Sequence, residues 1–309
     1  MKKVFIDGSA GTTGLKIVER LSKRKDLELI ILSEEIRKDI NARKQAINSC
    51  DVAFLCLPDV AAIEAVGLIE NPQVKVIDTS TAHRVNPDWV YGFLELDGKR
   101  ELIKNSKRIA NPGCHASGFI ALIEPLIKKG IIDKNIALTC FSITGYTGGG
   151  KKMIAEYESA DRPFTFDAPR QYGLSQKHKH LPEMVGVCGL EITPVFCPIV
   201  ADYDMGMEVT VPLFKKDING SVEDIKSVYK QVYNGKVVKY VEDADEGGLL
   251  SANVMRGRDD MQISVHGNDD RILLVSRFDN LGKGASGAAI QNMNVLLGVD
   301  ETTGLNLGE

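Results

Sequence analysis

The stretch VFIDGSAGTTGLKIVERL (residues 4–21) decides the fold of this chain. It opens with a short apolar run that ends at an aspartate, and the glycine-rich segment GSAGTTG (8–14) follows directly. Leu15, Val18 and Leu21 then recur at near-helical spacing. The stretch therefore predicts a strand, a tight glycine turn and a helix, which is the first unit of a parallel α/β sheet.

The segments that follow continue this alternation. LELIIL (27–32), DVAFLCLP (51–58) and KVIDTS (75–80) are apolar enough to be parallel strands buried on both faces. Residues 59–69 read as a helix, and Asp59 is expected to be its N-cap. Strands alternating with helices predict a Rossmann-type, doubly wound parallel sheet.

The segment NPGCHASGFIALIEPLIKKG (111–130) predicts a long helix. A turn at Asn111-Pro112-Gly113 places the start of the helix at or just after Cys114, and Gly130 is its natural stop. Pro125 lies inside the apolar stripe, so we expect a local bend there.

The rest of the chain has a different texture, with β-rich runs at 136–144, 189–200, 206–214 and 271–280. They predict a second, α+β domain with a mostly antiparallel sheet. The small-residue segment 283–298 reads as a final helix.

Length and composition limit the classes of protein. The 309 residues suit about two domains, and 43% hydrophobic with 26% charged residues is ordinary for a globular chain. A net charge of −4 gives no general attraction to nucleic acid. No apolar run approaches the roughly 20 residues of a membrane span, and the N-terminus does not resemble a signal peptide. The cysteines form no CxxC pair, so we expect free thiols in the cytoplasm; they are Cys50, Cys56, Cys114, Cys140, Cys188 and Cys197.

Gly8, Gly11 and Gly14 could hold a dinucleotide, because glycine lets the backbone approach a pyrophosphate at a helix N-terminus. The spacing is GxxGxxG and not GxGxxG, so an ordinary tight turn is the alternative. After the second strand, Ser33 and Arg37 would suit a ribose 2′-phosphate, whereas the acids between them would suit a free hydroxyl. The alternative interpretation is that these charged residues form a solvent-exposed loop with no ligand.

Cys114 is the candidate nucleophile. Thiol pKa values fall at a helix N-terminus, and the same N–H groups could hold an oxyanion on a bound substrate. Free cysteines are more often buried structural residues. We accept that interpretation for the other five cysteines.

His178 and His180 are the candidate proton carriers for this cysteine, within QKHKHLPEM, which also contains Glu183. The HxH pair could hold a metal, but no third ligand stands at a familiar spacing, so we expect no metal site. Solvent-exposed histidines are the other alternative. Ser80, His83 and Arg84 after the fourth strand, and GYTGGGKK (145–152) with Lys151, are candidate anion sites or flexible loops.

Taken together, these strings resemble one family, the N-acetyl-γ-glutamyl-phosphate reductases in their shorter form. The matching strings run in the family's order along nearly the whole chain: GSAGTTG (8–14), CLPDVAA (56–62), IDTSTAHRV (77–85), ANPGCHASG (110–118), GYTGGGK (145–151), HKHLPEM (178–184), GMEVTVPL (206–213) and DNLGKGASGAAIQNMNVLLG (279–298). The related aspartate-semialdehyde dehydrogenases share the fold and the cysteine chemistry.

The resemblance implies a reductase of arginine biosynthesis that uses NADPH, forms a thioester on Cys114 and moves protons with His178 or His180. It implies a cofactor domain of residues 1–113 with 285–309, and a catalytic and oligomerisation domain of residues 114–284. A homodimer or homotetramer is expected, with no nucleic acid or membrane partner. The expected cofactor-binding residues are Gly8, Ser9, Ala10, Gly11, Thr12, Thr13, Gly14, Ser33, Arg37, Ser80, Lys283 and Gly284. The expected substrate-binding residues are Asn111, Arg84, Gly148, Gly149, Lys151 and Glu183.

The chain departs mildly from the family pattern. His115 stands where the family often has tyrosine after NPGC, and it adds a second candidate proton carrier; Thr144 and Thr147 replace serines of SGYSGGG. Three other functions fit some of the same residues: a reductase of another acyl phosphate, such as β-aspartyl phosphate or a carrier-bound amino acid; a nucleotide sensor; and a cysteine hydrolase using Cys114 with His180. The hydrolase would leave the glycine loop unused, and a sensor need not keep the cysteine and histidines.

Overall fold

The computed structural model describes residues 1–308, which form two compact units. Unit 1 holds residues 1–94, 98–112 and 285–305, and unit 2 holds residues 113–284 with two short segments, 95–97 and the residues from Asn306 on. No helix within residues 1–308 is long and apolar enough to cross a bilayer.

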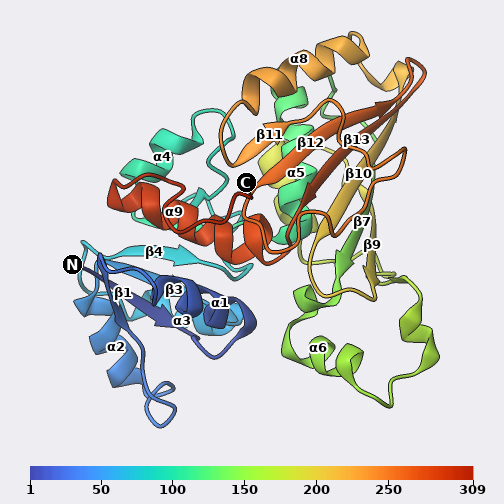
Figure 1. The fold of residues 1–309 in the computed structure, drawn as a ribbon. Helices are drawn as coiled ribbons and strands as arrows, with labels where there is room; N and C mark the ends of the chain where they lie inside the picture. Colours follow the sequence, from blue (N-terminus) through green and yellow to red (C-terminus); the bar gives the residue numbers. More distant parts are fainter. Residues whose placement is uncertain (309) are drawn as a thin grey trace. The chain divides into compact units, whose positions relative to one another are not determined.

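Unit 1 is built on a six-stranded sheet (Figure 1). Its elements are β1 (Lys2–Asp7), α1 (Thr12–Leu21), β2 (Leu27–Ile30), α2 (Ile40–Ser49), β3 (Val52–Leu55), α3 (Asp59–Gly67), β4 (Lys75–Asp78), β5 (Val90–Tyr91), α4 (Lys99–Asn105), β6 (Arg108–Ala110) and α9 (Gly287–Leu297). The strand order is β2-β1-β3-β4-β6-β5, and every neighbouring pair is parallel. The predicted doubly wound parallel sheet is confirmed.

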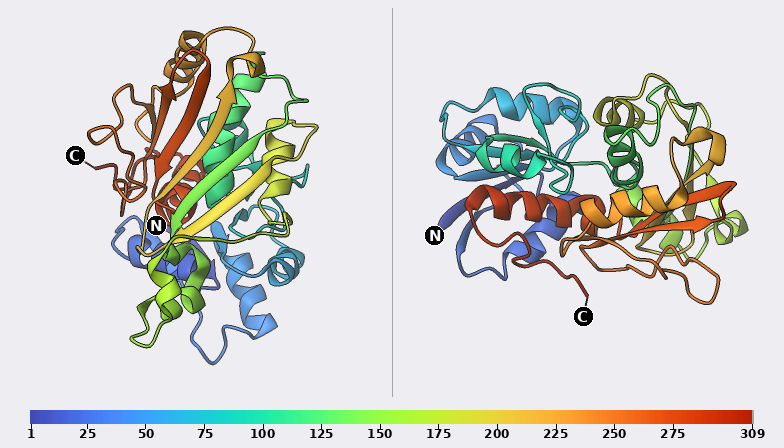
Figure 2. Two further views of the ribbon diagram at one scale, coloured as in Figure 1. Left: turned by 90° about the vertical axis from the view of Figure 1, so that its right-hand side faces the viewer. Right: turned by 90° about the horizontal axis from the view of Figure 1, so that it is seen from above.

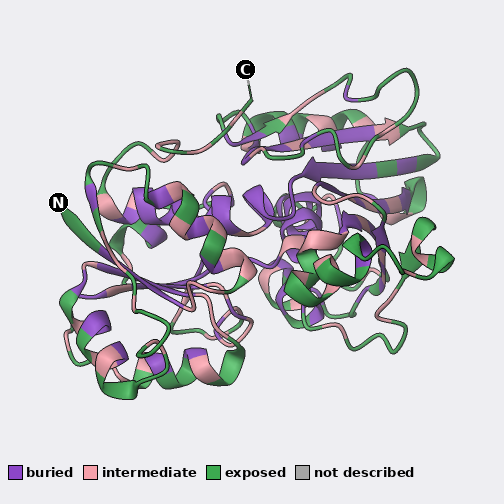
Figure 3. Cartoon of the chain, turned by 60° about the horizontal axis from the view of Figure 1, so that its bottom comes forward, coloured by how far each residue is buried: buried purple, intermediate pink, exposed green. Residues whose placement is uncertain are grey.

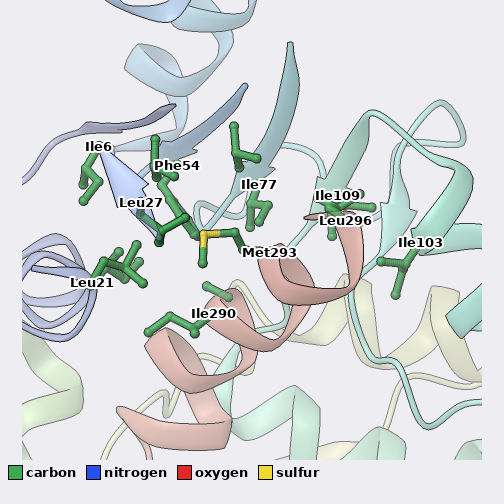
Figure 4. Packing of buried hydrophobic residues seen from close by; sticks show 14 of the residues in the cluster. Ile6, Leu21, Leu27, Phe54, Ile77, Ile103, Ile109, Ile290, Met293 and Leu296 are labelled. Atoms are coloured by element: carbon green, nitrogen blue, oxygen red, sulfur yellow. The ribbon is translucent and has the colours of Figure 1, made fainter. Parts of the chain in front are cut away.

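The core of unit 1 lies on both faces of this sheet. On one face, α9 returns from the end of the chain and packs Ile290, Met293 and Leu296 against strand residues such as Phe54 and Ile77 (Figure 4). The helices beside the sheet keep an exposed outer side, whereas the strands are buried (Figure 3). Burying these apolar side chains is the main stabilising contribution to the unit.

Unit 2 is built around a seven-stranded mixed sheet whose long strands lie side by side (Figure 2). Its elements are α5 (Cys114–Lys128), β7 (Thr139–Gly145), the short 3₁₀ helix η1 (Tyr146–Gly149), α6 (Gly150–Glu158), the 3₁₀ helix η2 (Phe164–Asp167), β8 (Arg170–Gln171), α7 (Leu181–Cys188), β9 (Val195–Ala201), β10 (Met207–Phe214), the 3₁₀ helix η3 (Lys215–Asp217), α8 (Val222–Val232), β11 (Val238–Tyr240), β12 (Met261–Gly267) and β13 (Arg271–Phe278). A π-helical turn, η4 (Gly282–Ser286), follows the last strand.

The strand order of this second sheet is β11-β12-β13-β10-β7-β9-β8. The pairs β12–β13, β13–β10, β10–β7 and β9–β8 are antiparallel, and β11–β12 and β7–β9 are parallel. The prediction of a mostly antiparallel sheet is therefore confirmed, with the two parallel pairs β11–β12 and β7–β9.

Helix α5 runs through the core of unit 2 and begins at Cys114, as predicted. Pro125 has no N–H to donate to the carbonyl of Ala121, one turn earlier. The hydroxyl of Tyr233 donates to that carbonyl at 2.6 Å, and the hydroxyl of Tyr229 donates to the next one, on Leu122, at 2.6 Å. The buried backbone around the proline is thus hydrogen-bonded by side chains from the α8 region.

Four expected local structures differ from those observed. Asp59 is not an N-cap: α3 is capped by Pro58, and the Asp59 carboxylate instead accepts hydrogen bonds from the backbone N–H and hydroxyl of Thr81. The predicted strand 189–200 starts only at Val195, because Gly189 at φ +69° ends α7.

The predicted loop 145–152 is largely helical, with η1 followed directly by α6. The predicted final helix 283–298 is divided between the π-helical turn η4 and α9.

Helix α5 packs closely against the second sheet at Gly118. A Cβ at this position would lie 2.4 Å from Cγ2 of Val209 and 2.7 Å from Oγ of Ser276, on β10 and β13. We expect Gly118→Ala to lower the free energy of unfolding by about 1–3 kcal/mol through overpacking, as measured by urea denaturation. Gly67→Ala is the matched control, because this exposed helical glycine has no neighbour within 4 Å. Equal effects of the two substitutions would contradict the packing argument.

Candidate functional site

The candidate nucleophile stands at the start of a long, buried helix. Cys114 is the first residue of α5, and Gly113 before it is the extended N-cap, at φ −81° and ψ 147°. No acidic side chain lies in the first turn of the helix. The N–H groups there and the positive end of the helix dipole favour negative charge on sulfur or on an oxygen bound to it.

Two residues of unit 2 fix the position of this turn. The Gly113 N–H donates to Oε2 of Glu183 at 3.1 Å, and Glu183 is only 1% exposed. Gly284 packs against the cysteine itself, since a Cβ at Gly284 would lie 2.9 Å from Cβ of Cys114. Glu183 thus holds the backbone of the nucleophile turn, and Gly284 leaves space for the cysteine side chain.

The two candidate proton carriers lie in one aromatic cluster with the residue next to the nucleophile. The ring centroids of His178 and His180 are 4.7 Å apart and lie 5.7 Å and 5.6 Å from the ring of His115. Phe196 on β9 packs edge-on against His178 and His115 at 5.1 Å and 5.3 Å. The fold thus brings both predicted histidines next to the Cys114 turn.

His178 and His180 differ in their surroundings. His178 is half-buried, and its Nδ1 accepts a hydrogen bond from the backbone N–H of His180 at 3.2 Å, so Nε2 carries the proton of the neutral ring. His180 is buried, and its Nε2 lies 4.0 Å from Oε1 of Glu183. The half-buried ring is the better placed of the two for exchanging protons with a substrate or with solvent.

The sequence suggested His115 as a second proton carrier, and the structure places both of its ring nitrogens in hydrogen bonds. Its Nδ1 lies 2.6 Å from the hydroxyl of Ser142, and its Nε2 lies 2.6 Å from the hydroxyl of Tyr172. Burial, and then the charge of His178, lower the pKa of His115 to about 3. At neutral pH the ring is therefore uncharged, with both nitrogens engaged.

Desolvation raises the thiol pKa of four of the other five cysteines. It raises the pKa of Cys50 and of Cys56 to about 12, and it raises the pKa of Cys140 and Cys188 as well. Such thiols stay protonated and unreactive at physiological pH. All six cysteines are free thiols.

In unit 1, the glycine-rich segment makes a closely packed turn. Gly8 has φ +82°, and a Cβ there would lie 2.2 Å from the carbonyl oxygen of Cys56. A Cβ at Gly14 would lie 2.3 Å from the carbonyl oxygen of Gly8, and the N–H of Gly11 donates to the same oxygen at 3.0 Å. Helix α1 starts at Thr12, so Ser9, Ala10 and Gly11 precede it and Thr12 and Thr13 open it. The turn presents a helix N-terminus with little side-chain bulk.

A cavity of about 270 Å³ opens beside this turn. Gly8, Ser9, Arg37 and Lys38 are among its lining residues, and Ser33 is not. Arg37 also forms a 2.5 Å ion pair with Glu34. The cavity combines a glycine turn with two cations, as a phosphate-bearing ligand would require.

Sequence reasoning missed Arg43, which also lines this cavity. It is buried and pairs with Asp7 at 3.0 Å and with Glu64 at 2.5 Å. No local pattern marks it, because its partners lie 36 and 21 residues away in the sequence.

The segment after β4 is a network of internal hydrogen bonds. The Ser80 hydroxyl donates to Oδ2 of Asp78 at 2.7 Å, and Nδ1 of His83 lies 2.6 Å from the same oxygen. Arg84 donates from Nε to the carbonyl of Asn111 and from Nη2 to that of Thr79, both at 3.0 Å. The side-chain amide of Asn111 donates to the carbonyl of Ala285 at 3.1 Å. Two of these predicted ligand-binding residues, Arg84 and Asn111, therefore also hold neighbouring backbone segments in place through hydrogen bonds to carbonyl groups.

The remaining predicted site residues lie in two other parts of unit 2. Gly148 and Gly149 end η1, and Lys151 is exposed in the first turn of α6. Lys283 is 1% exposed, and its ammonium lies 2.7 Å and 3.0 Å from the two carboxylate oxygens of Glu95. Within residues 1–308, no group of three or more His, Cys, Asp or Glu side chains could hold a metal ion.

Comparisons with known proteins agree with this arrangement. Residues 3–106 match the family described as "Semialdehyde dehydrogenase, NAD binding domain", and residues 114–280 match "Semialdehyde dehydrogenase, dimerisation domain". Among solved structures, aspartate semialdehyde dehydrogenase II from Vibrio cholerae superposes with a TM-score of 0.72 at 17% identity, covering 96% of this chain and 98% of that one. Aspartate semialdehyde dehydrogenase with NADP from Candida albicans superposes with a TM-score of 0.68 at 16% identity, covering 96% of this chain and 98% of that one. These likenesses show the fold.

Curated relatives are far more similar in sequence. N-acetyl-gamma-glutamyl-phosphate reductase 2 of Nostoc sp. is 44% identical, with 98% of this chain and 99% of the relative covered. N-acetyl-gamma-glutamyl-phosphate reductase of Sinorhizobium medicae is 45% identical, with 96% of this chain and 98% of the relative covered. The chain therefore belongs to the N-acetyl-γ-glutamyl-phosphate reductases, a family of oxidoreductases with the NAD-binding and dimerisation domains of the semialdehyde dehydrogenases.

Proposed function

We propose that this protein reduces N-acetyl-γ-glutamyl phosphate to N-acetylglutamate γ-semialdehyde and phosphate, with NADPH as the reductant, in arginine biosynthesis. The observation that carries the proposal is Cys114 at the N-terminus of α5, beside His178 and His180. The names of the relatives supply the substrate. A carboxylate-level carbon becomes a hydride acceptor once it is held as a thioester.

Cys114 performs the first step. Its thiolate attacks the γ-carbonyl carbon, the C–S bond forms, and the C–O bond to phosphate breaks. The N–H groups at the start of α5 stabilise the negative oxygen of the tetrahedral intermediate. After reduction, the thiohemiacetal loses the thiolate again and releases the aldehyde, so the cysteine is regenerated.

His178 is the acid–base group of this scheme, and His180 with Glu183 supports it. The Nε2 proton of His178 is available to the oxygen that gains charge, because Nδ1 is engaged by backbone. His180 contacts the ring of His178 from its buried position beside Glu183.

The residues of unit 1 fit a nicotinamide dinucleotide. Gly8 and Gly14 leave no space for a Cβ, Gly11 to Thr13 form the helix N-terminus, and Arg37 with Lys38 lines the cavity beside them. When bound, the cofactor supplies the hydride. Arg37 would hold a 2′-phosphate and so favour NADPH over NADH. Residues 1–113 with 285–309 are proposed as the NADP-binding domain and residues 114–284 as the catalytic domain, although residues 95–97, Gly113 and those from Asn306 on cluster with the second unit.

The residues proposed to bind or surround the acyl phosphate are Arg84, Asn111, Gly148, Gly149, Lys151 and Glu183. Those proposed to lie along the cofactor are Ser33, Ser80, Lys283 and Gly284. A homodimer or homotetramer is proposed from the dimerisation-domain match and from apolar side chains exposed on neighbouring strands of the second sheet. These are Phe141, Val195, Phe214 and Leu273, between 40% and 57% exposed. Free thiols, including a reactive one, suit the reducing cytoplasm.

The first prediction concerns the nucleophile. In the reverse direction, the semialdehyde, phosphate and NADP should give reduced nucleotide, and Cys114→Ser should abolish this while NADPH binding persists. Cys188→Ser is the control, because that thiol is buried and protonated. Phosphate-independent turnover, or full activity of the Cys114 variant, would contradict the thioester route. Higher kcat/KM with β-aspartyl semialdehyde would reassign the substrate.

The second prediction separates the histidines. His178→Ala should lower kcat about 10²–10⁴-fold, the range for a lost general acid–base group, with NADPH affinity unchanged. His180→Ala should cost less in kcat. His266→Ala, on β12 and hydrogen-bonded to Ser264, should be close to wild type. A larger loss for His180 than for His178 would reverse the assignment.

The third prediction tests the cofactor preference. Arg37→Gln should raise KM for NADPH about tenfold or more, the loss expected for a hydrogen bond to a charged group, and leave KM for NADH nearly unchanged. Lys44→Gln, a surface cation of α2 that pairs with Glu70, should change neither value. Equal effects on both nucleotides would remove Arg37 from the 2′-phosphate site.

A further inference from the structure

The loop between β7 and α6, residues 145–149, contains two of the glycines proposed to surround the acyl phosphate, and we call it the Thr147 loop (Figure 1). Its backbone pairs with the segment before β10. The N–H of Thr147 donates to the carbonyl of Asp204 at 3.1 Å, and the N–H of Gly145 donates to the carbonyl of Gly206 at 3.0 Å. A Cβ at Gly145 would lie 2.4 Å from the Asp204 carbonyl oxygen. The two segments are therefore closely packed.

The hydroxyl of Thr147 bonds to protein on two sides. It lies 2.6 Å from the carbonyl oxygen of Asp204, and because a carbonyl can only accept, the hydroxyl is the donor there. With its proton used in this way, the hydroxyl accepts from Nδ2 of Asn280, which lies 3.1 Å away. It thus links its own loop to the segment that carries Asn280.

Asn280 is a buried amide, 1% exposed, in the turn that follows β13. Its Oδ1 accepts the backbone N–H of Gly206 at 2.9 Å, and this contact fixes the orientation of the amide because a backbone N–H can only donate. Nδ2 therefore faces Thr147. A Cβ at Gly148 would lie 3.3 Å from this Nδ2, so the Thr147 loop packs directly against the amide.

Asn280 belongs to the same turn as the glycine that packs against the candidate nucleophile. Its neighbour Asp279 accepts the N–H of Gly282 on its carboxylate and the N–H of Gly284 on its carbonyl, both at 3.0 Å. Gly284 in turn packs against Cβ of Cys114. Hydrogen bonds within this turn thus connect the contact with the nucleophile at one end to the contact with the Thr147 loop at the other.

We propose that Asn280 is a positioning residue for phosphate binding, whose amide holds the Thr147 loop in place relative to the Cys114 turn through the Thr147 hydroxyl. The inference rests on the proposed function in taking Cys114 as the nucleophile and the loop as part of the acyl-phosphate site. Glycine loses more conformational freedom on ordering than any other residue, and residues 148–150 are all glycine. A loop that is ordered beforehand pays less of this entropy when phosphate binds.

The first measurement is steady-state kinetics in the reverse direction, with inorganic phosphate as the varied substrate. Thr147→Val is nearly isosteric, removes the hydroxyl, and should raise KM for phosphate about three- to tenfold, the range for one lost hydrogen bond. Both kcat and KM for NADP should stay within about twofold of wild type, because the ordering cost is shared by the bound ground state and the transition state. Thr147→Ser keeps the hydroxyl and should restore the wild-type KM.

Thr165→Val is the matched control, because it makes the same change at an exposed position of η2. It should leave all kinetic constants unchanged. A merely structural role for Thr147 would lower the thermal stability and either leave both KM values unchanged or raise them equally. Equal KM values for phosphate in the Thr147→Val and Thr147→Ser variants would overturn the proposal.

A double-mutant cycle ties the effect to Asn280. Asn280→Leu removes the amide at similar volume and should also raise KM for phosphate. In the double variant with Thr147→Val, the increase should be smaller than the product of the two single effects, because both changes break the same hydrogen bond. An increase equal to that product would mean that Thr147 acts through Asp204 alone, which would overturn the proposal. If Asn280→Leu does not fold, the two Thr147 variants decide.

Backbone hydrogen exchange tests the link without any turnover. Exchange in the peptide that contains residues 145–152, read by mass spectrometry, should be faster in Thr147→Val than in wild type or Thr147→Ser. Unchanged exchange in Thr147→Val would overturn the inference even in an active reductase. A protein without reductase activity but with the expected exchange would refute the proposed function and leave the link between Asn280 and the loop standing.

Discussion

The hydrogen bond from the Gly113 N–H to the buried carboxylate of Glu183 is the interaction on which the candidate site depends. It joins the start of α5, which carries Cys114, to α7, whose N-cap is His180. A carboxylate that is 1% exposed needs such donors to remain buried. The turn that carries the candidate nucleophile and the histidine segment are therefore joined by a buried hydrogen bond from the main chain to a side-chain carboxylate.

Local signals in the sequence predicted the parts of this arrangement that are themselves local. The glycine turn was predicted because glycines follow a strand and open a helix, and the structure adds that a Cβ at Gly8 or Gly14 would collide with backbone. The start of α5 was predicted because Asn111-Pro112-Gly113 forms a turn. The same kind of signal failed at Asp59, where a good N-cap residue bonds Thr81 instead. Propensity describes what a residue can do, and a partner from elsewhere in the fold decides whether it does so.

The roles that the sequence could not predict depend on partners far along the chain. Lys283 is conspicuous in its motif, yet its ammonium lies on Glu95, 188 residues earlier. Arg43 lies in an unremarkable helix and becomes part of a buried ion network with Asp7 and Glu64. His115 looked like a proton carrier because of its place beside Cys114, yet its two ring nitrogens are engaged by Ser142 and Tyr172, 27 and 57 residues further along the chain.

Desolvation accounts for these assignments with one physical cause. In a buried thiol the charged form is the thiolate, which loses its hydration, so the pKa rises, as for Cys50 and Cys56. In a buried imidazole the charged form is the imidazolium, which loses its hydration, so the pKa of His115 falls. Both effects favour the neutral form, which can only give or accept hydrogen bonds. Inside the protein, a reaction that needs an ionised side chain therefore requires protein groups that stabilise the charge in place of bulk water. At Cys114 the N–H groups of the helix N-terminus can provide that solvation, which supports the proposal that Cys114 is the nucleophile.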